Sequence, residues 1–328
     1  MKIIVTMPLS DAQKQKLEKK APQAEFFYCR GGWFRGAEQE KLLSEAEVIL
    51  GNVKLPGQLA KAKALRWLQL NNAGTEGYCE PGVLLEGVQL TNATGAYGPA
   101  ISEHMLACLF MLRKKLDRYY QNQLRSVWKS EGHVASVGGS TVLCVGLGDI
   151  GGTFARKMKA LGAYTIGIKR RTSEKPDYLD ELYTAEQFAD EARARELLGR
   201  ADTVALSMPG NAETRRLFDE KMLSMMKETA VLLNVGRGSA VDTDALCCFL
   251  QAGKLGGAAL DVTDPEPLPA EHPLWHAPNV IITPHISGGF SLPETLERIV
   301  DICADNLERY QKQEPLRNLV DFGRGYAI

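Results

Sequence analysis

Short apolar runs alternate with amphipathic stretches along almost the whole chain. In the first hundred residues the pattern predicts strands at Ile3–Val5, Glu25–Tyr28, Val48–Leu50, Trp67–Leu70 and Val88–Leu90. Between these runs it predicts helices at Asp11–Lys20, Ala37–Glu45 and Pro56–Ala62. Such alternation is typical of a parallel sheet that is covered by helices on both faces.

A second series of the same kind begins after residue 140. It predicts strands at Thr141–Val145, Thr165–Ile168, Thr203–Leu206, Val231–Val235, Gly256–Leu260 and Val280–Ile282. One long helix, about Pro99 to Arg125, is expected between the two series, and an amphipathic helix at Leu292–Tyr310 follows the second. We therefore predict an α/β protein with two parallel sheets, and 328 residues are enough for two domains.

Composition narrows the functional classes. Lys plus Arg (39) nearly balances Asp plus Glu (40), so the net charge of -1 gives no reason to expect nucleic acid or a membrane surface as partner. No stretch approaches the ~20 apolar residues of a membrane span. The seven cysteines form no CxxC pair, which indicates free thiols in a reducing cytoplasm. Glu271, His272 and His276 lack a further convincing ligand, so we predict no metal site.

A glycine-rich turn follows the first strand of the second series. Gly146, Gly148 and Gly151 form a GxGxxG pattern between the predicted strand Thr141–Val145 and a helical stretch. The first glycine permits a tight turn, the second lets the backbone approach a pyrophosphate, and the third lets the helix lie close to the strand. In this context the pattern predicts a dinucleotide site.

The end of the next strand indicates which dinucleotide binds. An NAD site usually places a carboxylate there to bind the ribose 2′-hydroxyl. This chain instead places Lys169, Arg170 and Arg171 there. Because arginine binds phosphate oxygens in a bidentate manner, the cluster favours NADP, with NAD as the alternative.

Three further residues each follow a short apolar run in the second half of the chain. They are Arg237, Glu266 and His285, so each is expected at the exit of a buried strand. A guanidinium, a carboxylate and an imidazole beside a nicotinamide are the groups needed to reduce the keto group of a 2-keto acid.

The chain resembles the D-isomer-specific 2-hydroxyacid dehydrogenase family over nearly its whole length. The resemblance is carried by the segments VLCVGLGDIGG, LLNVGRGSAVD, GGAALDVTDPEPLP and NVIITPHISGG. It implies two Rossmann-like domains, with a coenzyme domain at 101–289 inserted into a flavodoxin-like substrate domain at 1–100 plus 290–328. It also implies an active site in the cleft between them, and a homodimer formed through the helix near 100–125.

The resemblance also implies roles for single residues. His285 would protonate the carbonyl oxygen, Glu266 would favour its imidazolium form, and Arg237 would bind the substrate carboxylate. Ala73 and Gly74 would hold that carboxylate through backbone amides. The residues implied at the cofactor, besides the glycines and cations above, are Asp149, Ile150, Met208, Pro209, Val235, Gly236, Asp261 and Gly288.

We thus predict an NADP(H)-dependent D-2-hydroxyacid dehydrogenase that works mainly as a 2-keto acid reductase. Glyoxylate or hydroxypyruvate is the expected substrate, by analogy with NADP-using relatives. One alternative is a short phosphoglycerate dehydrogenase, with Arg30 or Arg35 in its phosphate pocket. The other is a non-catalytic NAD(P)-sensing binding protein, because the family includes corepressors that keep all three residues.

Overall fold

The computed structural model describes residues 1–289, 292–323 and 326–327. The chain divides into two compact units. Unit 1 comprises Met1–Tyr97 together with Phe290–Ile328, and unit 2 comprises Gly98–Gly289. Each unit has its own parallel sheet, so the predicted α/β fold with two parallel sheets is confirmed.

Unit 1 is built on a five-stranded parallel sheet. Its strands are β1 (Lys2–Val5), β2 (Glu25–Tyr28), β3 (Val48–Leu50), β4 (Trp67–Gln69) and β5 (Gln89–Thr91). Their order is β2-β1-β3-β4-β5, as in flavodoxin-like folds. Strands β3 and β4 consist entirely of buried residues, and all of them except Gln69 are apolar, which explains why both segments stand out as short apolar runs.

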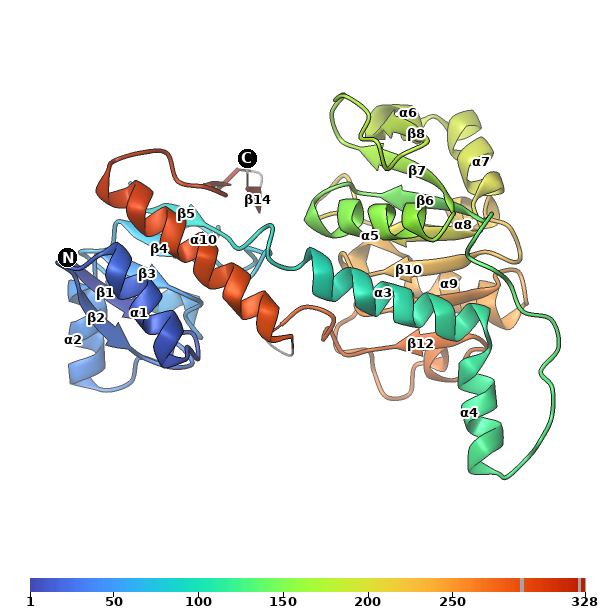
Figure 1. Cartoon of the computed structure of the whole chain (residues 1–328), viewed down its shortest axis with the longest axis horizontal. Coiled ribbons are helices and arrows are strands. Elements are labelled where there is room, and N and C mark those ends of the chain that lie inside the picture. The colour runs from blue at the N-terminus through green and yellow to red at the C-terminus, as the bar shows by residue number, and fades with distance from the viewer. Residues whose placement is uncertain (290–291, 324–325, 328) are drawn as a thin grey trace. The chain divides into compact units, whose positions relative to one another are not determined.

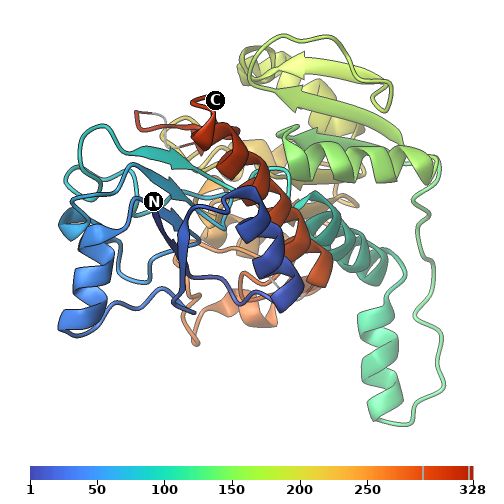
Figure 2. The same cartoon turned by 60° about the vertical axis from the view of Figure 1, so that its left-hand side comes forward.

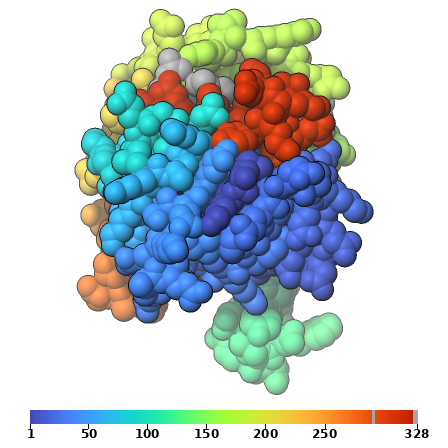
Figure 3. Space-filling model, turned by 90° about the vertical axis from the view of Figure 1, so that its left-hand side faces the viewer, coloured from blue at the N-terminus to red at the C-terminus, as the bar shows by residue number. Residues whose placement is uncertain are grey.

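Helices from both ends of the chain complete unit 1. They are α1 (Asp11–Lys20), α2 (Ala37–Glu45), the 3-10 helix η1 (Pro56–Lys61) and α10 (Pro293–Gln311). Helix α10 packs against α1, where Lys16 lies 2.5 Å from Glu297. The buried Asn306 of α10 donates to the side chain of Gln69 at 2.9 Å. Figure 3 shows the red C-terminal segment lying directly against the blue N-terminal segment.

Unit 2 is built on a seven-stranded parallel sheet (Figure 1). Its strands are β6 (Thr141–Val145), β7 (Tyr164–Lys169), β8 (Glu181–Thr184), β9 (Thr203–Leu206), β10 (Val231–Asn234), β11 (Gly257–Leu260) and β12 (Val280–Ile282). Their order is β12-β11-β10-β9-β6-β7-β8. The strand order therefore reverses between β6 and β9, which is where open α/β sheets bind their ligands.

The helices of unit 2 lie on both sides of this sheet. They are α3 (Gly98–Arg113), α4 (Leu116–Leu124), α5 (Asp149–Ala160), α6 (Ala185–Ala189), α7 (Glu191–Arg200), α8 (Glu220–Ser224), α9 (Thr243–Gln251), and the 3-10 turns η2 (Gly238–Ala240) and η3 (Pro273–His276). The apolar pattern did not reveal β8, α6, α7, α8 or α9. No helix in the described part of the chain is long and apolar enough to span a membrane.

The single helix predicted from Pro99 to Arg125 is wrong. The structure breaks it into α3 and α4 at Lys115, which adopts a left-handed backbone conformation with φ of 55°. A left-handed residue cannot continue a right-handed helix, so the chain changes direction there. Helix α4 then extends away from the sheet of unit 2, and residues 125–137 return along it (Figure 2).

Candidate functional site

The three predicted catalytic residues follow three adjacent strands of unit 2. Arg237 comes after β10, Glu266 after β11 and His285 after β12. These strands are neighbours in the sheet and run parallel, so their carboxyl ends meet at one edge. The fold therefore gathers the three residues at the same edge of unit 2 as the glycine-rich turn that follows β6.

Arg237 is positioned by the last residue of β10. Asn234 is buried, its side-chain oxygen accepts from the Gly236 amide at 3.1 Å, and its side-chain nitrogen donates to the Arg237 carbonyl at 3.0 Å. One amide side chain thus holds both ends of the turn that carries the guanidinium. The Arg237 guanidinium is half-buried and donates to the Gly236 carbonyl at 2.7 Å.

The loop that carries Glu266 packs closely on the Arg237 loop. A methyl group at Gly238 would lie 1.9 Å from the Thr263 carbonyl oxygen, so only glycine fits there. The Thr243 hydroxyl donates to the Asp264 carbonyl at 2.7 Å. These contacts fix the start of the loop, while Glu266 itself remains exposed.

Asp261 organises the segment that carries His285. Its carboxylate is buried and accepts from the Thr283 hydroxyl at 2.6 Å, the Ile286 amide at 2.9 Å, and both the amide and hydroxyl of Ser287. Its backbone carbonyl accepts from the His285 amide at 2.8 Å. Sequence reasoning assigned Asp261 to the nicotinamide and missed Thr283 and Ser287. The signal in the sequence that could have found these two residues is a hydroxyl side chain two positions before and two positions after His285.

His285 and Glu266 are joined by a hydrogen bond in which Nδ1 lies 2.7 Å from Oε1. An ionised carboxylate only accepts hydrogen bonds, so the proton of this contact belongs to Nδ1. Nε2 is therefore the ring nitrogen left to exchange a proton with a ligand. Both side chains are about half exposed, at 49% and 43%, and so are accessible from solvent.

The glycine-rich turn has the geometry of an anion cradle. A methyl group at Gly151 would lie 2.0 Å from the Gly146 carbonyl oxygen, so this glycine lets α5 start directly against the turn. A methyl group at Gly148 would meet nothing within 4 Å, and no side chain caps the first turn of α5. Open space above uncapped helix amides fits a pyrophosphate.

The remaining predicted cofactor residues lie around this turn. Met208 and Pro209 follow β9, and Val235 and Gly236 follow β10, while Gly288 comes directly after Ser287. Within the turn, Ile150 is half-buried and the Asp149 carboxylate accepts from the Gly98 amide at 2.7 Å. Asp149 therefore binds the first residue of α3, which accounts for a carboxylate at the start of α5.

The predicted cationic cluster lies at the carboxyl end of β7. Lys169 is the last residue of that strand, and Arg170 and Arg171 follow it. All three residues are exposed, and the Lys169 ammonium donates to the Ser173 hydroxyl at 3.1 Å. Strand β7 is the neighbour of β6, so the cluster follows the strand next to the glycine-rich turn.

The loop with Ala73 and Gly74 belongs to unit 1, where it follows β4. The Asn72 carbonyl accepts from the Ala93 amide at 2.9 Å, and the Ala73 carbonyl accepts from the Asn92 side chain at 2.7 Å. In a planar trans peptide the carbonyl and the next N–H point in opposite directions. The amides of Ala73 and Gly74 therefore point away from the residues that hold the loop.

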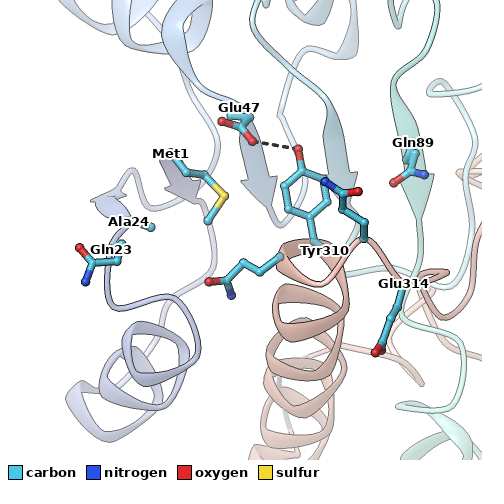
Figure 4. Close-up of a pocket in the computed structure, with 9 residues that line it drawn as sticks. Met1, Gln23, Ala24, Glu47, Gln89, Tyr310 and Glu314 are labelled. Carbon is cyan, nitrogen blue, oxygen red and sulfur yellow. Dashed lines mark hydrogen bonds between the residues drawn. The ribbon is translucent and has the colours of Figure 1, made fainter.

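Two other features of the structure lie apart from this chemistry. A cavity of about 690 Å³ in unit 1 is lined by Met1, Glu47, Gln89 and Tyr310, among others (Figure 4). It adjoins the amino ends of β1, β3 and β5, opposite the edge where α/β sheets bind ligands.

Both ring nitrogens of His272 have partners, Asp244 and the Leu274 amide, as expected for a residue that caps η3.

Comparison with known proteins identifies the family. The model of the D-isomer specific 2-hydroxyacid dehydrogenase NAD binding domain matches residues 106–287, more than half of the chain. The chain belongs to this family. It is 32% identical over 246 residues to a glyoxylate reductase from Korarchaeum cryptofilum, which covers 72% of this chain and 70% of that protein.

Solved structures agree with this assignment along the whole chain. A D-isomer specific 2-hydroxyacid dehydrogenase family protein from Aeromonas salmonicida is 31% identical, with a TM-score of 0.83 over 98% of this chain and 99% of that one. An NADPH-dependent glyoxylate/hydroxypyruvate reductase from Sinorhizobium meliloti, in complex with NADP and sulfate, is 26% identical, with a TM-score of 0.80 over 99% of both chains.

Membership of the D-2-hydroxyacid dehydrogenase family defines the general reaction. The protein is an oxidoreductase that binds a nicotinamide dinucleotide and transfers hydride between this cofactor and a 2-hydroxy acid or its 2-keto form. The predictions of family, enzyme class and nicotinamide cofactor are therefore confirmed.

Removal of the Thr283 hydroxyl should destabilise unit 2. Thr283→Val removes one of the two donors to Oδ1 of the buried Asp261 carboxylate and leaves only the Ile286 amide there, so we expect the free energy of unfolding to fall by about 1–3 kcal/mol. Chemical denaturation measures the difference. Thr283→Ser keeps the hydroxyl and is the matched control; a valine variant as stable as the wild type contradicts this role for Thr283.

Proposed function

We propose that the protein is an NADPH-dependent 2-keto acid reductase in which His285 is the acid/base, Glu266 its partner and Arg237 the substrate-binding cation. The observation that carries the proposal is the 2.7 Å contact between His285 and Glu266, on the loop next to the one that carries Arg237. When bound, the nicotinamide supplies the hydride that adds to C2 of the keto acid.

His285 completes the reduction by supplying a proton. Glu266 accepts from Nδ1–H and so leaves Nε2 as the ring nitrogen that passes a proton to the former carbonyl oxygen. Hydride at C2 and a proton at oxygen together convert the keto acid into the 2-hydroxy acid. In the oxidative direction the neutral Nε2 accepts the hydroxyl proton.

The Arg237 guanidinium balances the negative charge of the substrate carboxylate. Its guanidinium binds the carboxylate of the keto acid in a bidentate manner and polarises the adjacent keto oxygen, which lowers the cost of the charge that develops there. In unit 1, the Ala73 and Gly74 amides are donors to a carboxylate. This role is supported by the way the carbonyl groups of Asn72 and Ala73 are turned toward the residues that hold them.

The preference for NADP is supported by the three exposed cations that end β7. A 2′-phosphate adds about two negative charges next to the ribose, and Arg170 and Arg171 provide guanidinium groups for it. A carboxylate, which NAD sites usually place at this strand end, is missing from 169–171. NAD remains the alternative cofactor, and relatives of known structure include complexes with either dinucleotide.

Glyoxylate and hydroxypyruvate are the proposed substrates, as supported by the names of two similar proteins. A short phosphoglycerate dehydrogenase is the second candidate, and it predicts turnover of phosphohydroxypyruvate over hydroxypyruvate. The non-catalytic sensor predicts NADPH binding without reduction of any keto acid. One panel of keto acids, followed by NADPH and NADH absorbance, separates the three.

Removal of the imidazole should stop the reaction without preventing cofactor binding. For His285→Ala we expect kcat/KM for hydroxypyruvate to fall by about 100-fold or more, because the general acid is gone. NADPH affinity, measured by fluorescence titration, should stay close to that of the wild type. His276→Ala removes another exposed histidine as the control. Loss of NADPH binding by a folded His285→Ala protein contradicts the assigned role.

Removal of the two guanidinium groups after β7 should discriminate between the cofactors. Arg170→Ala combined with Arg171→Ala should raise the KM for NADPH about 10-fold or more and leave that for NADH much less affected, because only NADPH carries the 2′-phosphate. Steady-state kinetics with each cofactor measure both constants. Equal effects on NADPH and NADH would refute the 2′-phosphate site.

We also propose that the protein forms a homodimer through α4, in a reducing cytoplasm where its cysteines remain free thiols. Leu116, Tyr120 and Leu124 lie four residues apart on one face of α4, and all are more than half exposed. Trp128, in the segment after α4, is fully exposed. Such a continuous apolar surface is typical of an interface, and a two-fold axis pairs it with itself.

Charges on this face of α4 should separate the subunits. We expect Tyr120→Lys with Leu124→Lys to change the sedimentation mass from that of two chains to that of one, because two lysines per subunit would face each other across the axis. Leu161→Lys, at an exposed leucine after α5, is the control. A double variant that still sediments as two chains excludes α4 as the interface.

A further inference from the structure

A chain of hydrogen bonds joins α3 to the segment that carries His285. Helix α3 packs against β10 and β11 of unit 2 (Figure 1). On this helix His104 is half-buried, and its Nε2 lies 3.2 Å from the Thr283 hydroxyl oxygen. The Thr283 hydroxyl in turn donates to the Asp261 carboxylate at 2.6 Å. His104 therefore reaches the network around Asp261 from a helix far earlier in the chain.

The direction of the protons in this chain follows from its final acceptor. A carboxylate accepts hydrogen bonds, so the single proton of the Thr283 hydroxyl points to Asp261. Toward His104 the Thr283 oxygen can therefore only accept, and Nε2 of His104 must carry the proton of that contact. The neutral Nε2–H tautomer and the imidazolium both carry a proton there. His104 thus donates to Thr283 in either protonation state.

A buried thiol lies against the same ring nitrogen. Cys108 follows His104 by one turn of α3, and its Sγ lies 3.6 Å from Nε2. Burial raises the pKa of Cys108 to about 11, so this group is a neutral thiol at neutral pH. A neutral sulfur is only a weak acceptor, so the stronger bond of the Nε2–H group is the one to the Thr283 oxygen.

The next two residues in the chain of hydrogen bonds also hold the His285 backbone. The His285 amide donates to the Asp261 carbonyl at 2.8 Å and to the Thr283 carbonyl at 3.0 Å. His285 has φ of 53°, a conformation that persists in a residue other than glycine only when the surrounding contacts impose it. A shift of Thr283 relative to Asp261 would therefore change the direction of the His285 side chain.

The bond from His104 strengthens the bond from Thr283 to Asp261. A hydroxyl that accepts one hydrogen bond becomes a better donor of its own proton, because bonds in a chain polarise one another. The other donor to the same oxygen of Asp261 is the Ile286 amide at 2.9 Å. His104 thus determines how firmly the Thr283 hydroxyl holds this oxygen.

We propose that His104 is a positioning residue for the reduction, which acts through Thr283 and Asp261 to hold the His285 imidazole in the direction that proton transfer requires. This inference rests on the proposed reductase function and adds a residue to it. A small displacement of a catalytic group lowers the rate of the chemical step strongly. His104 therefore affects kcat more than the binding of NADPH or of the keto acid.

A pair of substitutions at position 104 tests this role. His104→Leu removes the donor, whereas His104→Gln retains an N–H group near the position of Nε2, and both new residues favour helices. With NADPH and the best keto acid of the panel, we expect kcat of the leucine variant to fall about 10-fold while KM changes less than about 3-fold. The glutamine variant should recover most of the loss. Glu103→Gln, at an exposed neighbour on α3, is the control.

Two further measurements distinguish positioning from a general loss of structure. NADPH affinity, measured by fluorescence titration, should stay close to that of the wild type; if the leucine variant fails this check, His104→Ala replaces it. The solvent deuterium isotope effect on kcat should rise in the leucine variant, because a misdirected imidazole makes proton transfer limit the rate.

Combined substitutions test the path through Thr283. If His104 acts through the Thr283 hydroxyl, adding His104→Leu to Thr283→Val should lower kcat no further than Thr283→Val alone. Additive losses, or a leucine variant with the kcat of the wild type, overturn the inference while the reductase function stands. A wild-type protein that reduces no keto acid of the panel overturns both.

Discussion

The buried carboxylate of Asp261 is the constraint on which the candidate site depends. A buried negative charge is costly unless its oxygens accept several hydrogen bonds, and here four donors from Thr283, Ile286 and Ser287 provide them. Those donors come from a segment of five residues, so the segment must curl around the carboxylate. His285 lies in the middle with φ of 53°, a left-handed conformation that few residues other than glycine adopt. The surrounding bonds stabilise that conformation and direct the imidazole toward Glu266.

Much of the fold could be predicted from apolar periodicity because most of the strands are buried. Strands β2, β3, β6, β9 and β12 have the predicted ends, and the other predicted strands differ by one residue at one or both ends. Strand β8 escaped prediction because it is a half-buried edge strand with the sequence ELYT, which lacks a continuous apolar run. The break at Lys115 escaped because a left-handed lysine has no sequence signal comparable to glycine.

The order of the candidate site residues along the chain could be predicted from the sequence, but the contacts that hold them in place could not. Arg237, Glu266 and His285 each follow an apolar run, and the parallel order of β10, β11 and β12 brings them to one edge. The holding role of Asn234 depends on two backbone groups that only the folded turn presents to it. The sequence predicts that Asp149 lies on the pyrophosphate. In the structure its carboxylate accepts from the Gly98 amide, and the two residues are 51 positions apart in the chain, beyond the reach of any local pattern.

Unit 1 consists of two chain segments separated by the whole of unit 2, and this affects how the protein can form during synthesis. Unit 2 is one continuous segment and has all its strands once residue 289 has left the ribosome. The sheet of unit 1 is translated first, yet α10 and the Asn306 amide that binds Gln69 are translated last. Until then α1 lacks its neighbouring helix, and the side-chain oxygen of Gln69 has the Thr91 hydroxyl as a donor but lacks Asn306. The unit that is made first is therefore the unit that is finished last.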